Sequence, residues 1–235
     1  MNILALDTSG PSVSVSILAG ACLRYEAALT HGRTHSQCLM PMVENALMET
    51  QMSLADMDAL AAVVGPGSFT GVRIGVATVQ GLARASNKPC LGINALEALA
   101  AGAGLQQGDI AICPLLDARA GQVYAAAFAP GLPPASLLPD EALPLADFLK
   151  KCASLGRPLL FLGDGAPVFR QAITASLGPL ASFAPPHLCG LRAGAVAVLA
   201  GCYAAQAATG GALLPYYLRA PQAERERARR GAGCG

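Results

Sequence analysis

Two aspartates end apolar runs that resemble each other. Asp7 ends "NILALD" and is followed by Thr8 and Ser9, and Asp117 ends "IAICPLLD". Carboxylates that face each other across a cleft can hold a metal–phosphate group, which is the chemistry of phosphoryl transfer. In the structural alternative, each aspartate bonds the backbone of its own turn. Residue type alone favours the structural role and leaves a kinase using Asp7 and Asp117 as a competing hypothesis.

A glycine-rich loop, "GPGSFTG" at 65–71, follows another apolar run. Its glycine spacing differs from that of an ATP-binding P-loop, and no lysine follows it. It fits the start of a helix, because Ser68 can cap one and the free N–H groups of residues 69–72 could hold an anion.

Beyond this loop, Gly71, Gly75 and Thr78 fall on one face of the predicted helix. A glycine costs about 1 kcal/mol in a helix interior. Two at this spacing indicate that another backbone approaches closely there. The spacing leaves open whether that backbone belongs to this chain or to a partner.

The pair His31 and His35, in "HGRTH", has the i, i+4 spacing of many metal ligands. The pair precedes the next helix, and no third ligand has a suitable spacing, since His187 is remote. We therefore expect capping or surface histidines, no metal and no cofactor. The sequence contains no Ser-His-Asp order and no HExxH motif, which are the patterns that would indicate a hydrolase.

Periodicity predicts an α/β protein whose opening is repeated. Asp117 matches Asp7 and Val123 matches Val13, at a spacing of 110 residues, which suggests two duplicated halves. Predicted strands cover 2–6, 12–18 (alternating, hence half-buried), 22–29, 60–65 and 89–94, and one more begins 157–166. Predicted helices cover 36–51, with Ser36 as cap, then 69–85, 95–104 and 191–208; 131–139 is a predicted proline-rich loop.

The composition fits a protein without a membrane span or a disulfide framework. Of 235 residues, 53% are hydrophobic, largely Ala and Gly, and the eight cysteines form no C-x-x-C pair. We expect a cytoplasmic protein with no leader segment. The net charge is +1, but residues 219–235 carry five Arg and two Glu, so the rest is slightly acidic. This argues against a protein that grips nucleic acid alone, and we expect 219–235 to be a disordered tail.

Five of the six methionines lie between 40 and 57, on or just after one helix. Met40 and Met48 lie off the predicted inward stripe, so part of this helix is a candidate partner surface. That stripe consists of Leu39, Val43, Ala46 and Leu47.

Six segments together resemble the TsaB (YeaZ) family of the bacterial tRNA threonylcarbamoyladenosine machinery. They occur in order over nearly the whole chain, and "GPGSFTGVRIG" is long and specific. Residues 130–155 match weakly, and the tail beyond Ala220 lies outside the pattern. The segments are "ILALDTS", "HSQCLMPMV", "GPGSFTGVRIGVATVQGLA", "LLDARAGQVYAAAF", "GDGA" and "PYYLR".

The resemblance implies an actin/Hsp70-like (ASKHA) fold of two ribonuclease-H-like halves, each with a mixed sheet and flanking helices. The first half would be 1–108 with a returning helix at 191–208, and the smaller second half 109–190. It also implies a non-catalytic subunit, with a vestigial nucleotide cleft at Asp7, Thr8, Ser9 and Asp117.

The implied role is a scaffold and activator that pairs with a TsaD-type catalytic subunit and a TsaE-type ATPase. It would dimerise when alone and meet tRNA only through the complex, which modifies the adenosine beside the anticodon. Helices 36–51 and 69–85 would form the interface, and Gly75→Leu would block pairing without harming the fold. The interface residues would be Leu39, Met40, Val43, Leu47, Gly71, Gly75, Thr78 and Leu82. The superfamily's old peptidase label needs a metal site that the sequence does not offer.

Overall fold

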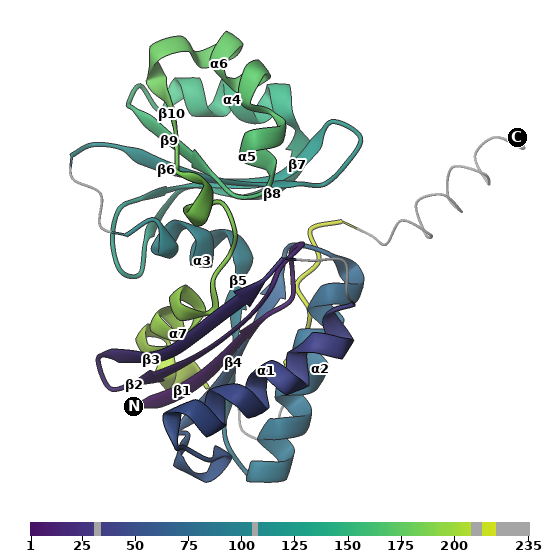
Figure 1. The fold of residues 1–235 in the computed structure, drawn as a ribbon. Helices are drawn as coiled ribbons and strands as arrows, with labels where there is room; N and C mark the ends of the chain where they lie inside the picture. Colours follow the sequence, from purple (N-terminus) through teal and green to yellow (C-terminus); the bar gives the residue numbers. More distant parts are fainter. Residues whose placement is uncertain (31–33, 105–107, 208–212, 220–235) are drawn as a thin grey trace, which may run out of the picture.

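The first of two five-stranded sheets combines an antiparallel meander with two parallel strands (Figure 1). The computed structural model describes residues 1–30, 34–104, 108–207 and 213–219. The strand order is β3-β2-β1-β4-β5, so β1 is central. The strands are β1 (Asn2–Asp7), β2 (Val13–Ala19), β3 (Cys22–Leu29), β4 (Ala59–Gly65) and β5 (Cys90–Asn94).

The second sheet repeats this plan, strand for strand, with the order β10-β9-β6-β7-β8. Asp7 is the last residue of β1 and Asp117 the last of β6, so the repeat seen in the sequence is present in the fold. The strands are β6 (Ala111–Asp117), β7 (Gln122–Ala129), β8 (Ala135–Pro144), β9 (Leu159–Leu162) and β10 (Ala181–Phe183).

Two long helices, α1 (His35–Thr50) and α2 (Phe69–Ser86), cover one face of the first sheet (Figure 1). The predicted cap of α2 is confirmed, because the Ser68 side chain accepts a hydrogen bond from the Gly71 N–H. The predicted cap of α1 is wrong by two residues. Thr34 caps that helix through a capping box with Gln37, and Ser36 lies inside it.

The opposite face of the first sheet carries α7 (Ala193–Cys202). Because α7 lies on it, Ser14 and Ser16 of β2 are fully buried, and the prediction of a half-buried strand is wrong. Alanine, valine and glycine dominate α7, and serine is small, so helix and sheet can approach closely.

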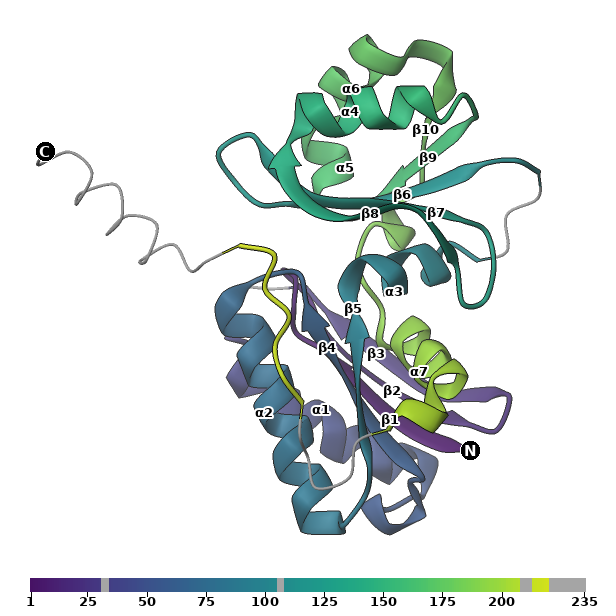
Figure 2. The ribbon, with the colours of Figure 1, turned by 180° about the vertical axis from the view of Figure 1, so that it is seen from behind.

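A short helix, α3 (Ala95–Gly102), lies between the two sheets (Figures 1 and 2). Its Leu96 and Leu99 belong to the same buried cluster as Ile112 and Phe128 of the second sheet. The two halves therefore share one hydrophobic core around α3.

Three helices flank the outer side of the second sheet (Figure 1). They are α4 (Leu145–Ser154), α5 (Gly165–Val168) and α6 (Arg170–Leu177). Four 3-10 turns complete the described chain: η1 (Leu54–Asp56), η2 (Gly178–Leu180), η3 (Pro186–Leu188) and η4 (Ala204–Gln206).

Two predicted boundaries differ most from the structure. The loop predicted at 131–139 becomes strand from Ala135, because β8 is an edge strand, where Pro139 need not donate to a second neighbour. The helix predicted at 191–208 is shorter and ends at Cys202. In the residues that the structure describes, no helix combines the length and apolarity that a membrane crossing requires.

Candidate functional site

The turn after β1 is bonded to the start of α2. The Thr8 hydroxyl donates a hydrogen bond to the Gly71 carbonyl (2.7 Å), and the Ser68 N–H donates to the Ser9 carbonyl (2.7 Å). The Ser9 N–H and hydroxyl both donate to Asp7 Oδ1, at 2.8 and 2.6 Å. The polar groups of this turn are therefore largely satisfied within the chain.

The glycines of the "GPGSFTG" loop and of α2 face this same turn. A Cβ added at Gly67 would lie less than 3.0 Å from the carbonyl oxygen of Ser9, and one added at Gly71 less than 3.0 Å from that of Thr8. Real Cβ atoms essentially never show such a separation. At Gly75 it would lie 2.5 Å from Thr8 Oγ1. The neighbour whose close approach the glycine spacing indicates is therefore the turn after β1, at Thr8 and Ser9 of this chain.

Four of the eight predicted interface residues are therefore misplaced. Gly71 and Gly75 are buried against Thr8, and Leu39 and Val43 are each 1% exposed in the core of the first half. A side chain at position 75 would lie too close to Thr8, so we expect Gly75→Leu to destabilise the fold and not to spare it.

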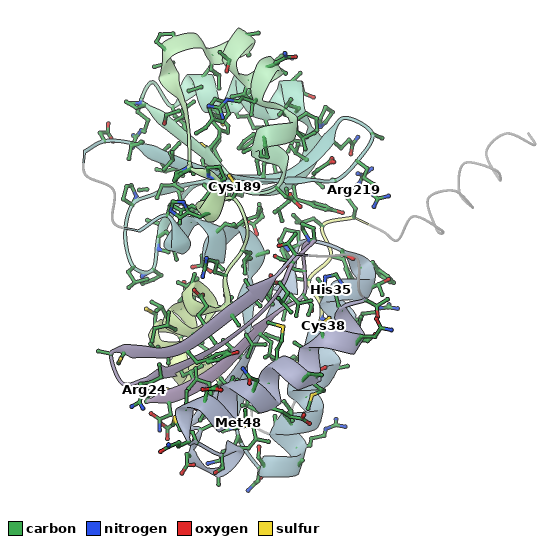
Figure 3. All side chains as sticks on the ribbon, in the orientation of Figure 1. Arg24, His35, Cys38, Met48, Cys189 and Arg219 are labelled. Carbon is green, nitrogen blue, oxygen red and sulfur yellow. The ribbon has the colours of Figure 1, made fainter. Side chains whose placement is uncertain are left out.

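The other four interface candidates reach the surface. Met40 is exposed, and Leu47, Thr78 and Leu82 are half-buried. Met48, on the outer side of α1 in Figure 3, is the most exposed methionine of the helix pair, at 66%. The outer face of α1 and α2 therefore remains a candidate partner surface.

Between the two halves lies a cleft of about 830 Å³. Ser9 and Asp117 line it, whereas Asp7 and Thr8 are buried and are not among its lining residues. His35 also lines it from the first turn of α1, while its sequence neighbour His31 lies outside the described residues. The described part of the chain contains no group of three or more His, Cys, Asp or Glu residues placed to hold a metal ion.

Asp7 is a buried carboxylate with little to balance its charge. Burial raises its pKa from 3.8 to about 6, the hydrogen bonds from Ser9 lower it, and the charge of Asp164 raises it. Its Oδ2 atom is buried and has no hydrogen-bond partner in the described structure. An ionised Asp7 is therefore a costly group at neutral pH.

Asp117 bonds its own turn, as the structural alternative predicts. Its Oδ1 accepts the Arg119 N–H at 2.8 Å, and its own N–H donates to Asp164 Oδ1 at 3.1 Å. Burial raises the pKa of Asp164. Arg119 and Ala120 both have positive φ, at 63° and 53°, so this turn carries backbone strain at the edge of the cleft.

Comparison with known proteins decides the family. The family model described as "TsaD: tRNA N6-adenosine threonylcarbamoyltransferase" matches residues 29–225. The chain is 36% identical over 180 residues to the tRNA threonylcarbamoyladenosine biosynthesis protein TsaB of Bacillus subtilis, covering 76% of this chain and 77% of that protein. The chain belongs to the TsaB family. TsaB of Escherichia coli is 40% identical over 124 residues, about half of each chain.

Solved structures agree with the TsaB assignment. YeaZ from Pseudomonas aeruginosa matches with a TM-score of 0.75 and 29% identity, over 92% of this chain and 99% of that one. Component A of the (R)-2-hydroxyglutaryl-CoA dehydratase of Acidaminococcus fermentans matches with a TM-score of 0.52 at 12% identity, a likeness of fold alone. The predicted fold class, two actin-like halves with mixed sheets, is confirmed.

One feature of this TsaB-family chain escapes sequence reasoning. Residues 216–219, of the segment "LLPYYLR", line the cleft together with Phe69 of α2. Two tyrosines in this short segment suggest that it packs against the rest of the protein. The sequence does not show which residues it packs against.

Proposed function

We propose that this chain is a non-catalytic scaffold and activator subunit in the biosynthesis of threonylcarbamoyladenosine in tRNA. It pairs with a TsaD-type catalytic subunit, works with a TsaE-type ATPase in the cytoplasm, and meets tRNA through that complex. The observation that carries the proposal is the 36% sequence identity to the TsaB of Bacillus subtilis, which extends over 76% of the chain. The match to the model named for the transferase indicates kinship with the proposed partner.

The site chemistry supports a subunit without its own phosphoryl transfer. The hydroxyls of Thr8 and Ser9 are used inside the chain, and Asp7 is buried with its Oδ2 atom unpartnered in the described structure. ATP turnover by the purified chain tests this. Turnover only when the TsaD-type subunit is present supports the scaffold, whereas turnover by the chain alone that Asp7→Ala abolishes would favour the kinase.

We place the partner surface on the outer face of α1 and α2. Met40 and Met48 expose flexible apolar side chains there, which can adapt to a TsaD-type subunit or to a second copy of this chain. On α2, Ala77, Gly81 and Ala85 are exposed at i, i+4 and i+8, and a Cβ at Gly81 would have nothing within 4 Å. This stripe of small residues lets a partner helix come close.

Gly81→Leu is expected to weaken pairing with the TsaD-type subunit by about 10- to 100-fold, because a leucine side chain overpacks a close helix contact. The fold is expected to survive, since position 81 faces open space. Co-elution and titration calorimetry measure pairing, and thermal unfolding measures the fold. Ala153→Leu, at an exposed position of α4 in the second half, is the matched control. Unchanged pairing by Gly81→Leu would remove this face from the proposal.

A further inference from the structure

Residues 213–219, here called the C-terminal strap, run along α2 toward the cleft (Figure 2). Leu213 is buried in the core of the first half, and Gln80 of α2 donates a hydrogen bond to its carbonyl at 2.8 Å. Further on, the Tyr216 N–H donates to the Val64 carbonyl at 2.7 Å. The strap is thus fixed to the first half at two backbone points.

Its aromatic residues hold the first turns of α2. The rings of Tyr217 and Phe69 have centroids 4.8 Å apart. The Arg73 guanidinium lies 3.8 Å from the Phe69 centroid, and its Nε donates to the Tyr217 hydroxyl at 2.9 Å. Phe69, Arg73 and Tyr217 therefore form one interlocked contact, which fastens the strap beside the cleft.

The body of the protein has a shaped seat for the strap. The pairing of β4 with β5 shifts between Val63 and Gly65, so Val64 is left out of the register, and its carbonyl accepts the Tyr216 N–H. Gly65 has φ +123°, and a Cβ there would collide with the Tyr216 carbonyl. Of the loop glycines, Gly65 serves the strap, whereas Gly67 and Gly71 serve the turn after β1.

The attachment is nevertheless thin. Leu213 is buried, but Leu214 is 84% exposed, and Tyr216 and Tyr217 are 41% and 38% exposed. The described strap belongs to neither sheet. It also reaches the second half, where Arg219 donates to the Ala118 carbonyl at 3.3 Å (Figure 3). Segments with few buried apolar contacts open locally at a lower free energy than the core.

We propose that the C-terminal strap opens and closes over the cleft as a unit while both halves stay folded. Residues 216–219 line the cleft, so their release widens it beside α2. The halves themselves resist a hinge motion, because α3 is packed into a core that both sheets share. The strap is therefore the part of the cleft wall that can move while the shared core stays packed.

Hydrogen exchange of the Tyr216 amide, measured on the full chain, tests the proposal. That amide is expected to exchange through local opening, at a rate that stays nearly constant in low urea. Amides of the central strands β1 and β4 are expected to exchange far more slowly. If Tyr216 instead shares the protection and the urea dependence of those strands, the strap opens only on global unfolding and the proposal is overturned.

Arg73→Ala isolates the fastening. It removes the cation–π contacts with Phe69 and Tyr217 and one hydrogen bond to Tyr217, so the Tyr216 amide is expected to exchange about tenfold faster, with the β1 amides unchanged. Arg170→Ala is the matched control, because the Arg170 guanidinium lies 4.3 Å from the ring centroid of Phe183, far from the strap. If both variants change the exchange rate of the Tyr216 amide, or if neither does, the contact of Arg73 does not hold the strap in place and the proposal is contradicted.

Discussion

Gly71→Ala is expected to destabilise the folded chain by about 3 kcal/mol or more. The added methyl group would lie less than 3.0 Å from the carbonyl oxygen of Thr8, which is a backbone atom and cannot rotate away. Thr8 is also held in place, because its hydroxyl donates to the Gly71 carbonyl. Overpacking against such a rigid neighbour costs about 1–3 kcal/mol and sometimes more. Urea unfolding followed by circular dichroism measures the loss.

Gly81→Ala supplies the control on the same helix. A Cβ at Gly81 has nothing within 4 Å, so this variant is expected to gain up to about 1 kcal/mol from helix propensity. The two variants make the same chemical change, and their difference of about 4 kcal/mol isolates the contact with Thr8. If Gly71→Ala and Gly81→Ala have equal stability, the turn after β1 yields to the methyl group and the close packing described above is wrong.

Much of the fold was predictable because the strands differ in pattern from the helices. The matching runs that end at Asp7 and Asp117 reveal the repeat, and each run forms the central strand of its sheet. Local sequence fails where a distant segment decides burial. Ser14 and Ser16 alternate with valines, as on a solvent-facing side, yet α7 covers them from about 180 residues further along the chain.

The candidate site shows the same limit. The spacing of Gly71 and Gly75 announces a close neighbour, but a helix pattern does not name the element that packs on it. The structure identifies Thr8 of the same chain, which leaves Gly81 as the exposed glycine of α2. The strap's seat at Val64 and Gly65 was equally hidden, since its partner Tyr216 lies about 150 residues away in the sequence.

Asp7→Asn is expected to stabilise the protein at pH 8 and to flatten its pH dependence. Burial raises the pKa of Asp7 from 3.8 to about 6, so the folded chain holds this proton more tightly than the unfolded chain. The stabilisation is fully present below about pH 4 and is lost as the pH rises through about 6. The shift corresponds to about 3 kcal/mol between those limits.

The asparagine keeps the Oδ1 acceptor for Ser9 and removes the charge, although its amide hydrogens meet the same unpartnered surroundings as Oδ2. We therefore expect a gain of about 1–3 kcal/mol at pH 8, which shrinks or reverses at pH 4.

The measurement is the free energy of unfolding of wild type and of Asp7→Asn as a function of pH. Raised pKa values at Glu97, Asp140 and Asp164 tilt the wild-type curve in the same direction, so the difference between the two curves is the informative quantity. Asp147→Asn, at an exposed position, is the control. It is expected to change the free energy of unfolding by no more than about 0.5 kcal/mol at either pH. A constant difference between wild type and Asp7→Asn from pH 4 to 8 would mean that Asp7 does not titrate in this range. If Asp7 is then ionised throughout this range, its buried charge is balanced by a group other than those described; if it is protonated throughout, burial raises its pKa further than about 6.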